Sequence, residues 1–324
     1  MKMSDFHSNL APAMQALIRQ RQALGYRDQG FWYELRHFDR YLVSVGWKEP
    51  DLTRKIVEDW ATSNGPIRPA TRVGRIGTAR ALARFLSETA PDTYIPGPVY
   101  GLRSTFRPHI YTTDEVQALL AETARLTPVG SIRPKTFVTL FALLYTTGLR
   151  LSEALKLTLS NADLDGGVLT IRESKFYKSR QVFLDPSATA ALRQYRQVCV
   201  QNGCRQDTDA PLLVNIRGRS CCAPSASATF LQVARRAGLR GPPGTRGPRL
   251  HDLRHTFAVH RLLAWYRDGG DVQSRLPLLS TYMGHVGIAS TQVYLDVTAE
   301  LLQEAARRFQ PPSFTKPSSF GGLS

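Results

Sequence analysis

Proline and glycine interrupt the chain roughly a third of the way along, over a stretch too broken for a regular helix or strand. The helical pattern before this stretch and the mixed pattern after it therefore belong to separate domains. With 324 residues, the chain is long enough for each domain to bury its own core. We predict a helical domain over 1–94, a linker over 95–110, a larger domain over 111–310 and a flexible tail over 311–324. The breakers are Pro91, Pro96, Gly97, Pro98, Gly101 and Pro108.

The predicted N-terminal domain carries apolar residues at helical spacing and no strand signal. The spacing predicts helices over about 10–24, 31–42, 52–61 and 69–88. At the start of the last helix, Arg68, Arg72 and Arg75 recur at i, i+4 and i+7, which suits contact with a DNA backbone. A basic face that meets only water explains the same spacing. The linker adds Arg103 and Arg107 beside aromatic residues, a mixture found in segments that cross DNA and in ordinary hinges.

The predicted larger domain combines buried helices with one hairpin. A helix begins at the N-cap Thr112 or Thr113, and an apolar helix over 137–145 breaks at Gly148. Arg150 follows this break and Glu153 lies within one turn of it, close enough to orient the guanidinium; an ion pair of little energetic value is the alternative. Strands over 168–172 and 181–184, then helices over 187–200 and 225–237, complete this pattern. The fold class is mainly α with a small antiparallel β-sheet, an α+β protein.

Two further segments place reactive side chains near helix ends. In 250–257, LHDLRHTF, a helix would point its leucines inward and present His251 and Arg254 on the opposite face, where they suit a phosphate; a solvated arginine is the alternative. A polar loop over 268–274 and a short helix over 278–283 should end at Gly284 and leave His285 exposed. Tyr294 follows on a further turn, and a last amphipathic helix spans about 299–308. That helix is too short to be stable alone.

The charge balance of the chain points to a polyanionic partner. Lysine and arginine outnumber aspartate and glutamate by 42 to 26, for a net charge of +16. Nucleic acid fits this charge, although ribosomal and membrane-surface proteins share it. No apolar run approaches the roughly 18 residues of a spanning helix, and the N-terminus lacks an apolar signal region, so we expect a cytoplasmic protein that does not enter the membrane. Four cysteines without a CxxC pair should be reduced.

Three motifs in the larger domain resemble those of the tyrosine recombinase, or phage integrase, family. TTGLRLSEAL, HDLRHTFA and MGHVGIASTQVYLDV occur in the family's order, over roughly Tyr111 to Glu304. The resemblance implies that residues 111–310 are the catalytic domain and that 1–94 is a core-binding domain. It also implies a site-specific recombinase that acts on double-stranded DNA, without a nucleotide cofactor or a metal, as four protomers that exchange strands through a Holliday junction. A phage or another mobile element is the expected setting.

The resemblance also implies a role for each matched residue. Tyr294 would attack a DNA phosphodiester and form a 3′-phosphotyrosyl link, releasing a 5′-hydroxyl. Arg150 and Arg254 would neutralise the phosphate oxygens, and Glu153 would orient Arg150. The remaining roles are general acid for Lys175, proton transfer around Tyr294 for His251, and a hydrogen bond to the phosphate for His285. Two departures stand out: Lys178 rivals Lys175 in the hairpin loop, and residues 265–275 are extra relative to compact members.

Three alternatives use the same residues. In a zinc-dependent hydrolase, His251 and His255 at i, i+4 would bind the metal with His285, although Asp252 stands where the glutamate of an HExxH helix would be. A type IB topoisomerase shares the phosphotyrosyl chemistry but acts alone on one strand. A basic DNA-binding protein with an inactive site is disfavoured because every expected catalytic residue type is present.

Overall fold

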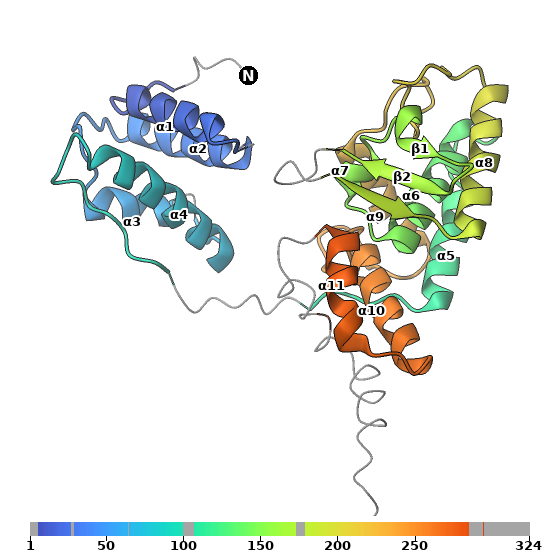
Figure 1. The fold of residues 1–324 in the computed structure, drawn as a ribbon. Helices are drawn as coiled ribbons and strands as arrows, with labels where there is room; N and C mark the ends of the chain where they lie inside the picture. The colour runs from blue at the N-terminus through green and yellow to red at the C-terminus, as the bar shows by residue number, and fades with distance from the viewer. Residues whose placement is uncertain are drawn as a thin grey trace, which may run out of the picture. The chain divides into compact units, whose positions relative to one another are not determined.

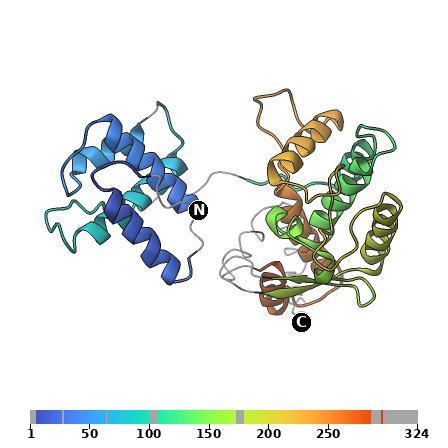
Figure 2. The same cartoon turned by 90° about the horizontal axis from the view of Figure 1, so that it is seen from above.

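The computed structural model describes residues 6–26, 29–63, 65–99, 107–172, 179–284 and 294. The chain divides into two compact units, Met1–Phe106 and Arg107–Ser324, and each contains a hydrophobic core of its own (Figure 1, Figure 2). Helices dominate both units, and the sheet that the structure describes has three antiparallel strands. The predicted fold class is therefore confirmed. None of the helices in these ranges is both long and apolar enough to cross a bilayer.

The first unit is built on the four predicted helices. Packing against α4 brings α1, α2 and α3 around one core, in which the rings of Phe38 and Trp60 stack 4.2 Å apart. The side chain of Thr53 begins α3 by accepting the backbone N–H of Ile56, which is a standard N-cap. The helices are α1 (Ala11–Ala23), α2 (Gln29–Ser44), α3 (Arg54–Thr62) and α4 (Pro69–Leu86).

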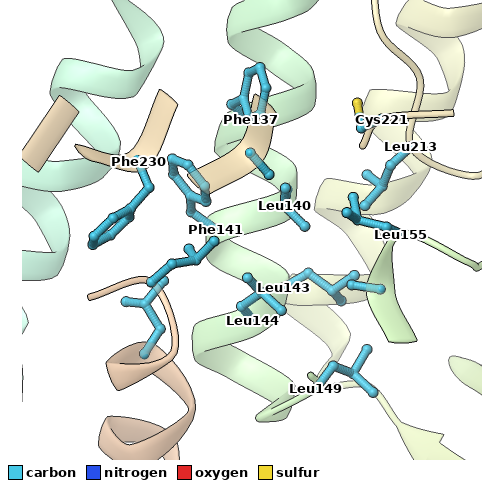
Figure 3. Packing of buried hydrophobic residues seen from close by; sticks show 14 of the residues in the cluster. Phe137, Leu140, Phe141, Leu143, Leu144, Leu149, Leu155, Leu213, Cys221 and Phe230 are labelled. Atoms are coloured by element: carbon cyan, nitrogen blue, oxygen red, sulfur yellow. The ribbon is translucent and has the colours of Figure 1, made fainter. Parts of the chain in front are cut away.

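The second unit is organised around α6, whose apolar side chains face its neighbours on several sides (Figure 3). Helices α5, α8 and α10 all pack on it. The sheet has the order β1-β2-β3, with Leu169 opposite Val182. The helical elements are α5 (Thr113–Ala124), α6 (Ile132–Thr147), α7 (Leu151–Ala154), η1 (Leu159–Asn161), α8 (Pro186–Gln201), α9 (Ala223–Arg236), α10 (Asp252–Arg267) and α11 (Val272–Met283). The strands are β1 (Ala162–Asp163), β2 (Val168–Ile171) and β3 (Arg180–Phe183).

Two sequence predictions about local structure are wrong. The predicted loop over 268–274 is shorter, because the Asp271 carboxylate accepts the backbone N–H groups of Gln273 and Ser274 and starts α11 there, despite Pro277 within the helix. The sequence of 161–167 is rich in turn residues and predicts no strand, yet Ala162 and Asp163 form β1, which pairs with β2. The extra residues 265–275 thus supply the end of α10, a short turn and the start of α11.

Candidate active site

Two helices of the second unit end side by side in left-handed glycines. Gly148 ends α6 with φ +63°, and Gly284 ends α11 with φ +67°. At Gly148 only glycine fits, because an added Cβ would come within 2.4 Å of the Phe257 ring. The last carbonyls of a helix lack partners within it and carry partial negative charge. The two helix ends therefore form an acceptor-rich site that favours cations.

Arg254 occupies this site and is almost fully buried, at 2% exposure. One of its Nη atoms donates to the Gly148 carbonyl and the other to the Met283 carbonyl at 2.7 Å. Burial, together with the positive charge of Arg150, lowers its pKa to about 10. The guanidinium therefore stays charged near neutral pH. The expectation of an exposed helix face is wrong here, because both helix ends enclose the side chain.

Arg254 also lines part of a hollow in the second unit. The hollow has a volume of about 260 Å³, and its walls are mostly apolar side chains of α6, α7 and α9. His251, Arg249 and Arg254 provide the polar part of its lining. Because each guanidinium has five N–H donors and Arg254 uses two on carbonyls, the remaining donors suit an anion at this position.

Arg150 is the N-cap of α7, and its side chain reaches the C-terminal end of α11. Its Nη2 donates to the Gly284 carbonyl at 2.9 Å, and its Nη1 donates to Glu153 Oε1 at 2.8 Å. The Glu153 carboxylate also accepts the backbone N–H of Arg150, which forms a capping box. The Arg150 side chain is 26% exposed, so it is held by these contacts but open to a ligand. The predicted proximity of Glu153 and Arg150 is present in the structure.

Glu153 is shared by two arginines. Arg180, from β3, donates to both of its oxygens, at 3.1 Å and 2.8 Å. Burial alone would raise the pKa of this carboxyl, but the hydrogen bonds and charge of Arg180 and Arg150 outweigh burial and lower the pKa to about 2. Glu153 is therefore ionised at every pH at which the protein would be used.

Tyr294 lies in the same site with only 4% exposure. Its hydroxyl and Nδ1 of His255 are 3.1 Å apart, a hydrogen-bond distance. Burial raises the pKa of the phenol above its ordinary value, and the positive charges of Arg254 and Arg150 oppose that rise. In this environment the phenol is neutral and needs a proton acceptor before it can act as a nucleophile.

The two histidines of HDLRHTF meet ring to ring. The rings of His251 and His255 make an edge-to-face contact at 4.9 Å. Burial, followed by the charge of His251, lowers the pKa of His255 to about 4, so its ring is neutral near pH 7. His251 is open to solvent on one side, but protein encloses enough of it that desolvation and the charges of Arg254 and Arg249 lower its pKa. Both imidazoles can therefore accept protons.

Several sequence candidates fall outside the described residues. These are Lys175, Lys178, His285 and Arg103. The strands β2 and β3 flank the segment with both lysines, as predicted. Within the described ranges, no group of three histidine, cysteine, aspartate or glutamate residues is placed to hold a metal ion. The zinc alternative includes His285, which these ranges do not cover.

The predicted basic face of α4 is only partly present. Arg68 and Arg72 are exposed, and so is Arg107 at the start of the second unit. Arg75 is buried instead, and its Nη1 donates to the carbonyls of Trp60 and Ser63 at 3.0 Å. Its guanidinium thus satisfies the C-terminal end of α3, and the prediction that it lies on an exposed face is wrong.

Sequence reasoning missed two residues of the site. His255 entered only as a possible zinc ligand, although its place one turn after His251 indicated a shared helix face. Arg180 was not considered, because an arginine at the start of a strand carries no local signal of its partners. Both contacts join segments far apart in the chain, Arg180 to Glu153 and His255 to Tyr294.

Comparisons with known sequences match the chain to a protein family. The model of the phage integrase family matches residues 110–300. A putative integrase/recombinase of Sinorhizobium fredii, y4rB, is 36% identical over 314 residues, covering 94% of this chain and 98% of that protein. Tyrosine recombinase XerC of Lactobacillus delbrueckii subsp. bulgaricus is 27% identical, with 87% of this chain and 88% of that protein covered.

Solved structures share the fold at lower identity. The Tn1549 transposon integrase in complex with transposon right end DNA has a TM-score of 0.65 at 15% identity, covering 92% of this chain and 99% of that one. The post-cleavage complex of XerH with its palindromic difH substrate has a TM-score of 0.64 at 18% identity, covering 94% and 90%. The resemblance seen in the three motifs is confirmed. The chain therefore belongs to the phage integrase family, and its activity is that of a site-specific tyrosine recombinase.

Proposed function

We propose that this recombinase cleaves and rejoins double-stranded DNA through a covalent link to Tyr294. The observation that carries the proposal is the position of the Tyr294 hydroxyl, buried beside His255 and within the electrostatic influence of Arg254 and Arg150. At this position the phenol oxygen would lie close both to a phosphate bound by the arginines and to an imidazole that can accept its proton. The net charge of +16 supports a DNA partner, as do the DNA complexes among the structural neighbours.

The proposed cleavage step exchanges one phosphorus–oxygen bond for another. The Tyr294 oxygen forms a bond to phosphorus, and the bond from phosphorus to the 5′-oxygen breaks. Arg150 and Arg254 stabilise the negative charge that builds up on the non-bridging oxygens. The leaving 5′-oxygen takes a proton from Lys175, and His285 donates a hydrogen bond to the phosphate. Attack of a 5′-hydroxyl on the phosphotyrosyl link reverses these steps and rejoins the strand.

The phenol proton leaves through the histidine pair. His255 is the imidazole that contacts the hydroxyl, and it is neutral near pH 7 because its pKa is about 4. His251 lies against the ring of His255 at the solvent side of the site. We assign the first proton acceptance to His255 and assistance to His251, which refines the role that the family resemblance implied for His251 alone.

The first unit and the linker would hold the DNA around this site. Residues 1–94 would bind the core of the target, 95–110 would connect to the catalytic domain over 111–310, and 311–324 would be a tail. Exposed Arg68, Arg72 and Arg107 would neutralise phosphates, and Arg103 of the linker would do the same. The integrase names of several relatives support a role in a mobile element or phage.

Covalent capture of DNA in the presence of excess EDTA tests the function. A nicked suicide substrate loses a short 5′-hydroxyl fragment after cleavage, so the protein stays attached and is scored as an SDS-stable adduct. We expect the adduct to form equally with and without EDTA, because arginine and lysine side chains supply the charge that a metal would. Cleavage that EDTA abolishes and zinc restores would favour the hydrolase alternative. Relaxation of supercoiled DNA without exchange between two sites would favour the topoisomerase.

Replacement of Lys175 by alanine should slow cleavage by about 10²- to 10⁴-fold, the usual contribution of a general acid. A substrate with sulfur in place of the 5′-bridging oxygen should restore the rate, because a thiolate leaves without protonation. The rate of adduct formation is measured for both substrates. Lys178→Ala is the matched control. Rescue of Lys178→Ala alone would transfer the role to Lys178.

We also propose that four copies assemble on paired sites through the segment after Tyr294. The sequence of residues 299–308, AELLQEAARR, predicts a short amphipathic helix, which would need to pack against another surface to be stable. A hollow of about 280 Å³ on α10 and α11 supplies an apolar surface with exposed Leu278 (67%) and Phe183 (64%). Its other lining residues are Phe257, Arg261, Trp265, Leu279 and Tyr282. The 299–308 segment of a neighbouring copy is the occupant that we propose.

Leu278→Asp should weaken cooperative binding to a paired site by at least about tenfold and leave binding to one half-site unchanged. A chain that ends after Val297 should behave in the same way. Gel shifts on one and two half-sites measure both effects, and strand-exchange products report recombination. Val129→Asp, at another exposed apolar position of the second unit, serves as control. Full cooperativity in both variants would contradict the assembly; loss of single half-site cleavage would indicate docking within one subunit.

A further inference from the structure

We propose that Arg180 is a positioning residue for strand cleavage, because it holds Glu153 and the end of α11 in the arrangement that presents Arg150 to the DNA phosphate. This inference rests on the proposed function and adds a residue that lies outside the motifs TTGLRLSEAL, HDLRHTFA and MGHVGIASTQVYLDV. Arg180 acts through other residues: the contacts that the structure gives its side chain are with Glu153, Tyr282 and the glycine turn at Gly284.

Arg180 joins three elements that are distant in sequence. It is the first residue of β3, its guanidinium spans both oxygens of Glu153 on α7, and its Nε donates to the Tyr282 carbonyl on α11 at 2.8 Å. The side chain is 9% exposed, and its carboxylate partner is still more buried. A planar guanidinium that uses both edges in this way defines the positions of its partners far better than a single ammonium would.

The sharing of Glu153 determines which donors of Arg150 remain available. Arg150 gives Glu153 one side-chain donor, and Arg180 gives it two. Without Arg180, the buried carboxylate would lose two of its four hydrogen bonds and would draw more of the Arg150 guanidinium toward itself. Arg150 would then turn away from the Gly284 carbonyl and from the phosphate. Arg180 thus leaves Arg150 free to serve the substrate.

Gly284 shows how closely Arg180 supports the end of α11. A Cβ atom at Gly284 would lie 2.7 Å from Nη1 of Arg180. The carbonyl oxygen of the same glycine accepts the hydrogen bond from Nη2 of Arg150. Arg180 therefore lies close to the turn on which Arg150 depends, and its hydrogen bond to the Tyr282 carbonyl holds it there.

Arg180→Gln should reduce the rate of adduct formation by about 10- to 100-fold while the DNA affinity stays within about twofold of the parent. The distinguishing measurement is the rate of adduct formation against pH. Glu153 has a lowered pKa, so its ionised form persists until the pH falls toward 2. Without Arg180 that pKa rises, and activity should be lost at a higher pH on the acidic side. If Arg180 only stabilised the fold, its loss would lower the rate without shifting the pH at which activity falls on the acidic side, here called the acidic limb.

Control variants distinguish the titration of the Glu153 carboxyl from that of other groups. Arg150, Arg180 and Arg254 are the charges that act on Glu153, while His251 and His255 titrate in every variant. Glu153→Gln and the double variant Glu153→Gln/Arg180→Gln should have the same acidic limb as each other. Arg180→Lys should restore part of the limb position and less of the rate. Arg193→Gln, which removes an exposed arginine bonded to Asp165, should match the parent.

The outcomes distinguish this inference from the proposed function. A parent protein that forms no adduct would contradict the function and the inference together. A reactive parent with an equally reactive Arg180→Gln variant would overturn the inference alone. The same holds for a slow Arg180→Gln variant whose acidic limb coincides with that of the parent, or whose limb still moves when Glu153 is glutamine.

Discussion

Tyr294→Phe should form no detectable covalent adduct with DNA while binding the target as tightly as the parent. The substitution removes one oxygen atom, the one that lies 3.1 Å from Nδ1 of His255. Loss of one buried hydrogen bond costs about 1 kcal/mol of stability, so the fold should persist. The nicked suicide substrate measures adduct formation, and a gel shift under the same conditions measures binding.

Tyr282→Phe is the matched control for this experiment. Tyr282 is the nearest rival along the sequence, and its hydroxyl donates to the Phe183 carbonyl at 3.1 Å, on β3. Burial raises the pKa of Tyr282 to about 12 although the charges of Arg261 and Arg180 oppose the rise, and its hydroxyl is bonded away from the Arg254 and Arg150 charges that act on Tyr294. The Tyr282→Phe variant should therefore form adduct at the parental rate. Adduct formation by the Tyr294 variant, together with its loss in the Tyr282 variant, would reverse the assignment of the nucleophile.

Arg254→Lys should slow cleavage by about 10²- to 10³-fold although it keeps the positive charge. A lysine cannot bridge the Gly148 and Met283 carbonyls and also donate to a phosphate, because its three donors diverge from one point. Burial beside Arg150 would also lower the pKa of a lysine further than that of the arginine. The rate of adduct formation on the nicked substrate measures the effect.

The same variant should also lower stability, since a buried carbonyl left without a partner costs about 1–3 kcal/mol. Urea unfolding in the absence of DNA measures this loss separately from catalysis. Arg267→Lys, an exposed position at the end of the same helix, should change neither quantity. Parental cleavage by Arg254→Lys would show that charge alone suffices at this position and would contradict the bridging role.

The sequence by itself determined the features that depend on local chemistry. Left-handed glycines end α6 and α11 where Gly148 and Gly284 were expected, because an αL helix end is set by the residue that occupies it. The capping box at Thr112 and the strands β2 and β3 follow from near neighbours in the same way. The motif resemblance placed Arg150, Arg254 and Tyr294 in one site, and the described geometry agrees with that grouping.

Only the tertiary structure decided which side chains these elements meet. Arg254 reads as an exposed residue from periodicity, but it is buried because α6 and α11 bring their carbonyl ends to it. Arg75 is turned into the first unit by the unpaired carbonyls at the end of α3. The contacts of His255 with Tyr294 and of Arg180 with Glu153 join positions that no local spacing relates. A buried guanidinium lies where carbonyl and carboxylate oxygens can accept its hydrogen bonds. Those acceptors come together only when the chain folds.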